Sequence, residues 1–589
     1  ILTMDKFSNS LPVAIASIGS SKITLLVGSA ITVGADATIP DNIILWFVGP
    51  GKLFVNSGKV LTINSPSQVL AHTQQQVFDG TGTVSFTNGG IVSPGWWGFS
   101  SGGTAAANAD AYNACTASLT ATGGAIIIPP TGAAHQVDDT LTHPAKPMSV
   151  IGAHPELSII ESTATASLKH GLTFTRSHHV RNLTIKTSAS LASNYDMYGV
   201  RMDLDGVTVS GGNQAVKWES VKVRGFNNSF YCDGGDAYNV DRLYFNDLDA
   251  QCSGPASTYI GSCLYINRVT QVYGTHSQFD QNSTGEHAIY CFGSKNLVFD
   301  GFKIRNFDKG TAQAIKVVGN GVAPDDDQAY PTWSIRNMDI ADGLNGILCG
   351  IYGTETLEAL TVENCKFVDV DTSAAILGCV YLSAAGTSNI RTLRVSGIST
   401  RNCLYQGVHV ATGASATMGP VSIRDCKGYN WSTTSAGTYT WFGTSGTGTF
   451  GPITLEGIEA DGNSKGRTIV SGSGQASTIS RIRYSGLKEV NTTNMGRPIS
   501  LPEADATPSM AIGNWFVQPN TGAQNITAYD NLEANQTYYI RFSTANTTLI
   551  DGANLQLAGS TNYNPPANTF MTFYCSDGTA LYEVSRSVN

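Results

Sequence analysis

Short runs that alternate apolar and polar residues recur from about residue 180 to residue 490. In most runs the first, third and sixth positions are apolar, and a small turn residue stands just before the sixth. The run Leu360-Thr-Val-Glu-Asn-Cys shows the pattern, with Asn364 at the turn position. The runs follow one another at roughly 25 to 36 residues, a period typical of repeat architectures. The others begin at Leu243, Val272, Leu297, Trp333, Leu393, Val421 and Ile453.

A second apolar run lies between successive repeats, as in Cys263-Leu-Tyr-Ile, Ala288-Ile-Tyr-Cys and Gly407-Val-His-Val. Two or three short strands per repeat, with no helical segment between them, describe one coil of a parallel β-solenoid. One coil cannot bury its apolar face alone and must stack on its neighbours. We therefore predict an all-β solenoid, whose function depends on the side chains that project outward from the stack.

The chain changes character on either side of these repeats. Residues 1–97 alternate short strands with Gly-rich turns, and an Ala-rich segment from Ala105 to Leu119 is the best helix candidate by propensity. We expect this helix to cap the open end of the solenoid. After about residue 500, prolines punctuate a linker, and strands follow that we predict to be antiparallel. The predicted divisions are 1–97, a β region; 98–500, the solenoid; and 501–589, a C-terminal β-sandwich-like domain.

Composition narrows the function classes. Only 13% of the residues are charged and the formal net charge is -9, with no basic stripe, which argues against a nucleic-acid partner. No apolar run reaches the roughly 18 residues that a membrane span needs, so we predict no membrane insertion. The 11 cysteines are scattered and form no CxxC pair, so we interpret them as buried small hydrophobes. The chain begins at Ile1 rather than Met, and we expect it to lack an N-terminal portion.

The order of parts carries a resemblance. A Trp96-Trp-Gly element, the Ala-rich helix, the strand Gly123-Gly-Ala-Ile-Ile-Ile-Pro and irregular coils together resemble the pectate-lyase-like right-handed β-helix of bacteriophage tailspikes. The resemblance covers roughly residues 85 to 500. The chain departs from the family pattern at Gly95, where Glu is usual, and at Ser100 to Thr104, where an Asp-rich stretch is usual.

The ending Asp577-Gly-Thr-Ala-Leu-Tyr-Glu-Val-Ser-Arg-Ser resembles the last strands of phage tail-fibre and tailspike proteins. The resemblance implies a homotrimer with a C-terminal domain for trimerisation or carbohydrate binding. It also implies a virion protein that joins the phage tail or baseplate through a missing N-terminal segment. Such tailspikes bind and cut a capsular, exopolysaccharide or O-antigen polysaccharide at the host surface. No cofactor is implied.

Hydrolysis of a glycosidic bond needs two carboxyl groups, one to protonate the leaving oxygen and one to activate water or attack the sugar. Corresponding residues of stacked coils lie about 4.8 Å apart, and residues i and i+2 of one strand share a face about 6.7 Å apart. Asp247 and Asp249 are such a pair, and Asp280 follows in the next coil. Glu286 and His287 lie at the entry of the following strand. We predict the catalytic set within Glu286, Asp280, Asp249 and Asp247.

The same coils carry residues suited to binding sugar, because flat aromatic rings make good sugar platforms. We predict substrate contacts from His276, Tyr273, Tyr290, Tyr265, His287, Lys303 and Arg305. Each prediction has a structural alternative. Asp247 falls in the turn column of Asn337 and Asn364, where such residues hydrogen-bond their own backbone. His276 could equally be a hydrogen-bonded surface residue, and the tyrosines could be ordinary strand packing.

Two other acidic runs are weaker candidates. Asp233-Gly-Gly-Asp236 with Asp241 could hold a cation, but Ca²⁺ takes roughly 6 to 8 oxygens, so we favour a plain turn and predict no metal. Asp325 to Asp327 lie in a long insertion and are a candidate for the wall of a substrate groove.

We therefore predict a polysaccharide depolymerase that works by hydrolysis. A lyase is the first alternative, because Lys303, Arg305 and His276 could neutralise a uronate carboxylate. A non-enzymatic glycan-binding adhesin is the second. An esterase is a third, since G-x-S-x-G occurs from Gly98 and from Gly462, but neither match is predicted to form the required strand-elbow-helix.

Overall fold

The structure is a computed structural model. It describes residues 1–119, 123–164, 169–188, 197–204, 214–236, 238–252, 261–281, 287–307, 313–319, 329–371, 378–403, 406–431, 441–462, 470–471, 482–485, 488–490, 499–510 and 514–587. The chain divides into two compact units, Ile1–Lys316 and Val317–Asn589, and each is described by itself.

The N-terminal part of the first unit already winds as a small parallel solenoid. Short strands at successive turns pair in parallel, so that three small sheets face one another around an apolar interior. The first sheet has β1 (Leu2–Thr3), β2 (Ile23–Val27), β5 (Ile43–Phe47) and β8 (Val69–Leu70). The second has β3 (Ala30–Val33), β6 (Lys52–Val55) and β9 (Phe78–Asp79), and the third has β4 (Ala37–Ile39), β7 (Val60–Ile63) and β10 (Thr83–Phe86).

Helix α1 (Leu11–Ile18) is a feature that the sequence did not predict, since residues 1–97 were expected to hold only strands and turns. Its buried residues Leu11, Ala14 and Ile18 follow helical spacing, and a proline stands in its first turn, where no intrahelical hydrogen bond is lost. A helix of 8 residues spans only about two turns, so its period is hard to distinguish from a short apolar strand.

The helix predicted between Ala105 and Leu119 is confirmed as α2 (Ala105–Ala117). Thr104 caps its first turn by accepting a hydrogen bond from the Ala107 amide, and Tyr112 and Cys115 are buried beneath it. The buried Asn108 side chain accepts from the Ser100 amide at 2.9 Å and donates to two backbone carbonyls. One of these carbonyls belongs to Gln136 on β13 (Ala134–Val137), so the hydrogen bonds of Asn108 tie the helix to β13, and the helix also packs on the 3-10 turn η3 (Pro94–Trp97).

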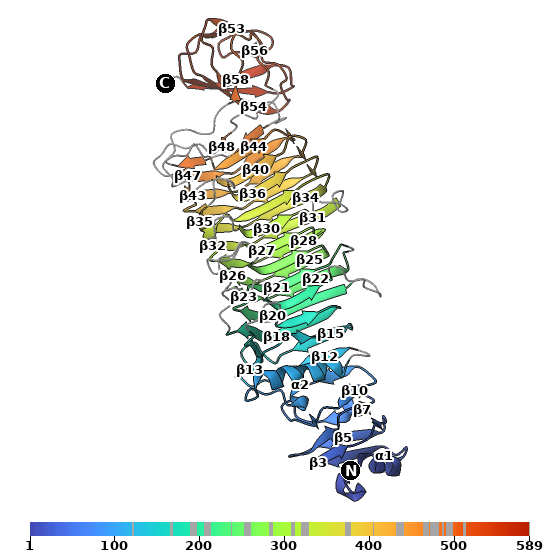
Figure 1. Cartoon of the computed structure of the whole chain (residues 1–589). Coiled ribbons are helices and arrows are strands. Elements are labelled where there is room, and N and C mark those ends of the chain that lie inside the picture. The colour runs from blue at the N-terminus through green and yellow to red at the C-terminus, as the bar shows by residue number, and fades with distance from the viewer. Residues whose placement is uncertain are drawn as a thin grey trace. The chain divides into compact units, whose positions relative to one another are not determined.

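Beyond α2 the first unit forms coils of a right-handed parallel β-helix with three faces (Figure 1). Face 1 has β11 (Gly90–Val92), β12 (Gly124–Ile127), β15 (Met148–Ile151), the first halves of β18 (His178–Thr187) and β20 (Gln214–Arg224), β22 (Val240–Asn246), β25 (Val269–Thr275) and β28 (Asn296–Asp300). Face 2 has β13 (Ala134–Val137), β16 (Ile159–Ser162), the second halves of β18 and β20, β23 (Asp249–Gln251), β26 (Gln278–Asp280) and β29 (Lys303–Arg305). Face 3 has β14 (Leu141–Thr142), β17 (Leu172–Phe174), β19 (Tyr198–Asp203), β21 (Asn228–Asp233), β24 (Ser262–Asn267) and β27 (His287–Phe292).

A column of left-handed residues turns the chain from face 1 to face 2. Ser220, Asp247, His276 and Gly301 hold this position in successive coils, with φ of 49°, 53°, 46° and 76°. This is the turn column predicted from the sequence, and the residues that tolerate positive φ most readily are Gly, Asn, Asp and His. The bend places the outward side chains of the two faces on either side of one corner.

Aromatic rings and neutral imidazoles fill the interior near α2. His143 stacks on Phe174 with ring centroids 4.0 Å apart, and Phe174 stacks on His178 at 3.9 Å. The Tyr112 hydroxyl lies 2.9 Å from Nε2 of His143, and the Trp218 indole donates to Nε2 of His178 at 2.9 Å. Both imidazoles therefore act as acceptors at Nε2 while their Nδ1 atoms face backbone carbonyls.

The second unit repeats the three-faced coil. One face has β31 (Ala329–Arg336), β34 (Thr356–Glu363), β37 (Asn389–Ile390), β38 (Leu393–Ser396), β41 (Thr417–Met418), β42 (Val421–Arg424), β45 (Thr449–Phe450), β46 (Ile453–Glu456) and β49 (Ile482–Ser485). The next has β32 (Asp339–Leu344), β35 (Lys366–Asp371), β39 (Ser399–Arg401), β43 (Lys427–Trp431), β47 (Glu459–Gly462) and β50 (Lys488–Val490). The third has β33 (Ile347–Ile351), β36 (Gly378–Ala384), β40 (Gln406–Thr412), β44 (Phe442–Gly446) and β48 (Val470–Ser471). The turn column again has positive φ, at Asn337, Asn364, Gly397, Asp425 and Gly457.

The C-terminal strands form a mixed sheet over a separate apolar core. At its centre β54 (Gln536–Phe542), β57 (Thr569–Cys575) and β58 (Leu581–Ser587) pair antiparallel, as predicted. The outer pairings, with β51 (Ile499–Ser500), β52 (Trp515–Gln518) and β56 (Leu555–Gln556), are parallel, and β53 (Gln524–Ile526) pairs with β55 (Thr547–Leu549). All 11 cysteines of the chain are buried and none is in a disulfide, which confirms their interpretation as small buried residues.

Candidate functional site

The residues predicted to form one site lie on different faces of the first unit. The acids Asp247, Asp249 and Asp280 and the basic residues His276, Lys303 and Arg305 lie at the corner between faces 1 and 2 or on face 2. Tyr273 projects from β25 on face 1, whereas Tyr265, Tyr290 and His287 belong to face 3. Glu286 falls outside the described residues. The predicted cluster is thus divided into a corner group and a face 3 group, with Tyr273 apart from both on face 1.

A shallow groove of about 410 Å³ runs along the corner of faces 1 and 2. Neighbouring strands place Lys222, Asp249, Gln278 and Lys303 at one register position, so their side chains form a column along its floor. The remaining lining residues are Pro155, Ser220, Asp247, Leu248, His276, Ser277 and Gly301. The structure therefore brings together four of the predicted site residues: Asp247, Asp249, His276 and Lys303.

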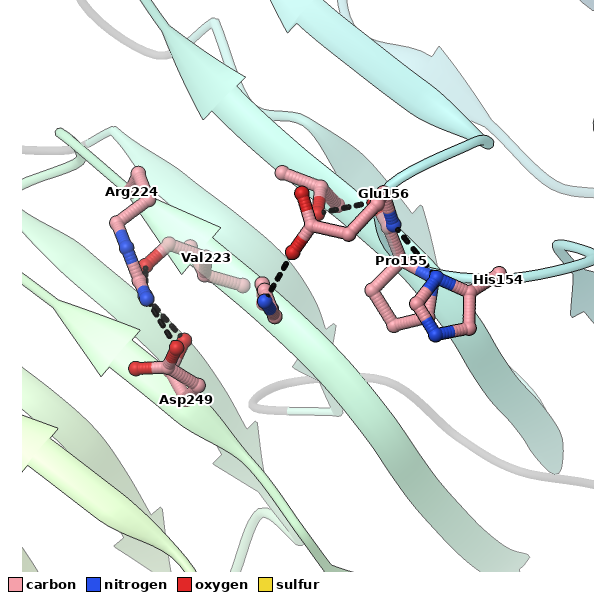
Figure 2. A network of polar contacts seen from close by, with 8 residues as sticks. His154, Pro155, Glu156, Val223, Arg224 and Asp249 are labelled. Carbon is pink, nitrogen blue, oxygen red and sulfur yellow. Dashed lines mark hydrogen bonds and ion pairs between the residues drawn. The ribbon is translucent and has the colours of Figure 1, made fainter. Parts of the chain in front are cut away.

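Ion pairs already engage several charges beside this groove, as Figure 2 shows. The guanidinium of Arg224 pairs with the Asp249 carboxylate, and Lys222 pairs with Glu156 on the loop before β16. Asp247 accepts a hydrogen bond from the Ser220 hydroxyl at 2.8 Å, and Asp280 accepts one from the Asn306 amide at 2.9 Å. Each of the three corner acids is thus already engaged by a side chain of the protein itself, which suits a structural or binding role.

Face 3 holds a second pair of carboxylates. Asp203 at the end of β19 and Asp233 at the end of β21 occupy the same register position on adjacent parallel strands. The guanidinium of Arg201 pairs with Asp203, whose side chain is 23% exposed. Asp233 is 5% exposed and accepts hydrogen bonds from the Asn267 amide, the Gly235 backbone amide and the Tyr231 hydroxyl.

Their surroundings give these two carboxyl groups different character. Burial raises the pKa of the Asp233 carboxyl above its usual range against the opposing effect of its hydrogen-bond donors, and the nearby charge of Asp203 adds to the rise. Asp203 instead pairs with the guanidinium of Arg201 and is more exposed to solvent than Asp233. Glycosidic cleavage uses two carboxyl groups in unlike environments, and this pair has one nearly buried carboxyl of raised pKa beside one that a guanidinium holds.

Arg201 is itself held in place by its neighbours. One of its Nη atoms lies 3.0 Å from Nε2 of His170, and its guanidinium lies over the rings of Tyr198 and Tyr231. Burial, and then the charge of Arg201, lower the pKa of His170 to about 4, so this imidazole is neutral and accepts the hydrogen bond. The neutral His170 and the tyrosine rings thus fix the guanidinium that pairs with Asp203.

A ladder of tyrosines continues from this pair along face 3. Tyr231 stacks on Tyr265 with ring centroids 4.9 Å apart and planes 5° apart, and Tyr265 meets Tyr290 edge to face at 5.4 Å. Lys316 lies over the Tyr290 ring at 4.8 Å. These rings are partly exposed, and neighbouring coils repeat them at the spacing of the strands. Such a row of aromatic faces and hydroxyl groups can support an extended sugar chain.

His287 lies at the end of this ladder but is only 1% exposed. Its Nδ1 accepts a hydrogen bond from the backbone amide of Gln313 at 3.2 Å, and burial lowers the pKa of the His287 imidazole well below the usual range. The imidazole is therefore neutral and supports Tyr290, whose ring it meets edge to face. Tyr273, by contrast, is 41% exposed on face 1, next to Tyr244 in register.

Sequence reasoning missed Asp203, Arg201 and His170, and it interpreted Asp233 as a plain turn residue. The turn interpretation is correct locally, because Asp233 accepts the Gly235 amide. The missed signal is a four-residue motif that recurs in three successive coils and ends in Asp or Asn. Its copies are Val200-Arg-Met-Asp, Phe230-Tyr-Cys-Asp and Leu264-Tyr-Ile-Asn. Aligning the second apolar run of each repeat would have placed the two acids side by side.

Within the described ranges, no three His, Cys, Asp or Glu side chains gather in a way that could hold a metal ion. In the same part of the chain, no helix is long and apolar enough to cross a membrane.

Comparisons with known proteins find only a distant likeness of fold. No family model and no curated protein matches this chain. Among solved structures, the catalytic unit of a GH87 α-1,3-glucanase from Streptomyces thermodiastaticus has a TM-score of 0.37 at 12% identity, covering 70% of this chain and 65% of that one. The match therefore spans less than two thirds of that catalytic unit.

Two further structures are similarly distant. The A-module of a mannuronan C-5 epimerase from Azotobacter vinelandii has a TM-score of 0.35 at 12% identity, covering 68% of this chain and 99% of that one. Tailspike protein 3 of bacteriophage CBA120 has a TM-score of 0.29 at 12% identity, covering 76% of this chain and 66% of that one. At these scores the likeness concerns the fold, and the chemistry must come from the side chains of face 3 and of the corner groove.

Proposed function

We propose that this protein is a polysaccharide depolymerase that cleaves a glycosidic bond by hydrolysis at face 3 of the first unit. The observation that carries the proposal is the register pairing of Asp203 with Asp233, with their two different environments, beside a ladder of tyrosines. The biological setting that fits is a tailspike that acts on a bacterial surface polysaccharide as a homotrimer. The order of sequence motifs from Trp96 through the Ala-rich helix to the coils, which resembles that of phage tailspikes, supports this setting.

In the proposed reaction, Asp233 is the general acid and gives its proton to the glycosidic oxygen as the bond to the anomeric carbon breaks. Asp203 attacks that carbon and forms a glycosyl ester. A water molecule then gives a proton to Asp233 and displaces Asp203, which restores both carboxyl groups. Adjacent parallel strands lie about 4.8 Å apart, close to the carboxyl separation of about 5 to 5.5 Å in retaining enzymes, so retention is favoured.

Arg201, His170 and the tyrosines have supporting roles in this proposal. Arg201 pairs with Asp203 and orients its carboxylate for attack, and neutral His170 holds the guanidinium in place. Tyr231 donates to Asp233 and also begins the aromatic ladder, so it links the acid to the bound chain. Tyr265 and Tyr290 extend the platform over two further coils.

The corner groove is the second candidate site, with Asp247 and Asp249 as its acids, in keeping with the sequence prediction that also named Asp280 and Glu286. Its volume of about 410 Å³ and the exposed His276 and Lys303 favour glycan contact there. The guanidinium of Arg224 already engages the Asp249 carboxylate, which argues against Asp249 as the residue that meets the glycosidic oxygen.

A lyase remains the rival reaction, because Arg201 could neutralise a uronate carboxylate while a base removes the neighbouring proton. A direct test incubates a panel of capsular and O-antigen polysaccharides with the protein and follows polymer length, new reducing ends and near-ultraviolet absorbance. Shorter chains with reducing ends and no new absorbance support hydrolysis, and new absorbance supports the lyase. Binding without any shortening supports a glycan-binding adhesin and contradicts the proposal.

A further inference from the structure

A second groove, of about 460 Å³, lies on the second unit along strands β34, β38 and β42. Two arginines and one glutamate supply its charges: Arg394, Arg424 and Glu363. The rest of its lining is small hydroxyl side chains and apolar surface, from Thr392, Leu393, Val395, Ser396, Pro420 and Ser422. The groove therefore combines a net positive charge with hydroxyl groups that can donate and accept hydrogen bonds.

Three other cations of these coils have acidic partners. Arg391 lies 3.3 Å from Glu358, Arg424 lies 3.3 Å from Glu456, and on the adjacent face Lys427 lies 3.7 Å from Glu459. In each case the acid comes from a neighbouring coil, so these charges are balanced within the protein.

Arg394 differs from them. Its neighbours at the same register position are Thr361 on β34 and Ser422 on β42, neither of which carries a charge. Its side chain is exposed, and in the part of the chain that the structure describes no carboxylate lies within ion-pair distance of it. Glu363, the one acid of the groove, lies instead at the register position of Ser396.

An exposed guanidinium in a groove of this kind suits a planar oxyanion. Its N–H donors match two oxygens of a carboxylate at once, and the Ser422 and Ser396 hydroxyls can bind sugar hydroxyl groups beside it. Arg424 is partly neutralised by Glu456 and hydrogen-bonded to Ser422 at 3.0 Å, so it keeps that hydroxyl in place.

We propose that this groove is a non-catalytic binding site for an acidic glycan, in which Arg394 recognises the oxyanion of a charged sugar. It lies in a different unit from Asp203 and Asp233, so the proposal does not depend on cleavage at face 3. The oxyanion could be a uronate carboxylate or a sulfate ester, and binding experiments can tell these sources apart.

The test measures binding of the full chain to three polymers by affinity electrophoresis: polygalacturonate, dextran sulfate and neutral dextran. We expect Arg394→Ala to weaken binding of polygalacturonate about tenfold, as the loss of a charge-assisted hydrogen bond predicts. Arg394→Lys should retain part of the binding, because an ammonium keeps the positive charge but lacks the two parallel N–H donors of a guanidinium. An equal loss for dextran sulfate identifies any oxyanion as the ligand, and a loss confined to polygalacturonate identifies the carboxylate.

Arg391→Ala is the matched control, because it removes the same charge from the same face but lies outside the groove. All variants should keep the thermal unfolding midpoint of the wild type. The proposal is overturned if the wild type binds neither anionic polymer, if dextran binds equally well, or if Arg391→Ala weakens binding as much as Arg394→Ala. Failure to cleave any polymer would contradict the proposed hydrolase but would leave this binding result unchanged.

Discussion

Asp203 and Asp233 are direct neighbours on adjacent parallel strands, yet their carboxyl groups have opposite surroundings. Asp203 pairs with the guanidinium of Arg201, whereas Asp233 is nearly buried and faces only neutral donors. The β-helix itself produces this pairing, because stacking places equivalent positions of successive coils side by side. A carboxyl group of raised pKa and a carboxylate held by a guanidinium can act as the acid and the nucleophile of one reaction.

The first prediction concerns pH. Since burial raises the pKa of Asp233, this carboxyl should keep its proton to higher pH than an ordinary Asp. The cleavage rate should therefore fall as pH rises through the raised pKa. In Asp233→Asn the rate should drop about 10² to 10⁴-fold and the alkaline limb should disappear. The measurement is the pH profile of reducing-end release, and an unchanged profile in Asp233→Asn would rule out its role as the acid.

The second prediction concerns the tyrosine ladder. Replacing Tyr265 by Ala removes the ring that stacks on Tyr231, so the polymer should bind less tightly, by about 1 kcal/mol or roughly fivefold in KM. The catalytic rate constant should change far less, because Tyr265 lies one coil beyond the carboxyl pair. Tyr265→Phe keeps the ring and should stay close to wild type. A loss in kcat alone would contradict a role as a platform.

The third prediction concerns acid stability. Burial lowers the pKa of His143 to about 4 and that of His178 to about 3. The folded state keeps both imidazoles neutral, whereas the unfolded chain binds protons below a pKa of about 6.5. Stability is therefore full above pH 6.5 and falls progressively as pH drops toward 4. For His143 alone the loss amounts to about 3 kcal/mol.

Thermal unfolding followed by tryptophan fluorescence measures this effect, because Trp218 donates directly to His178. His178→Gln should lower the midpoint at pH 7.5 and flatten its dependence on pH. The exposed His72 serves as the control, and His72→Gln should leave the pH dependence intact. A midpoint in the wild type that is constant between pH 7.5 and pH 4.5 would contradict the account.

The fourth prediction concerns the turn column of the second unit. Gly397 has a φ of 63°, and a Cβ there would lie 2.4 Å from Oδ1 of Asn364. Gly397→Ala should destabilise the protein by about 1 to 2 kcal/mol or more. A Cβ added at Gly522 would meet no atom within 4 Å, and the φ of Gly522 is not strained, so Gly522→Ala should be neutral. Equal midpoints of unfolding for both variants would show that the column does not constrain the backbone.

The fold could be predicted from the sequence because its signals are local and repeated. Each turn residue, such as Asn364 or Asp425, recurs at one place in the pattern, and α2 is marked by its alanines. The mixed pairing of the C-terminal sheet could not be predicted, since parallel and antiparallel strands share the same alternation of apolar and polar residues.

The site was predicted only in part. The column from Asp249 through Gln278 to Lys303 follows directly from aligned repeats. The face on which each run lies does not follow from the alignment, because the connections between runs vary in length and carry no register signal. Tyr265 and Asp249 were therefore grouped although they project from different faces. Asp203 escaped notice because Arg201 stands where the other coils have tyrosine.

The most direct test of the central claim compares Asp233→Asn with Asp249→Asn on a polysaccharide that the wild type shortens. Each substitution removes one carboxyl group from the first unit. Asp233→Asn removes it at face 3, and Asp249→Asn removes it in the corner groove. The account predicts that polymer length stays unchanged with Asp233→Asn and falls at close to the wild-type rate with Asp249→Asn. The reverse result, with cleavage lost only in Asp249→Asn, would place the reaction in the corner groove and contradict the assignment to face 3.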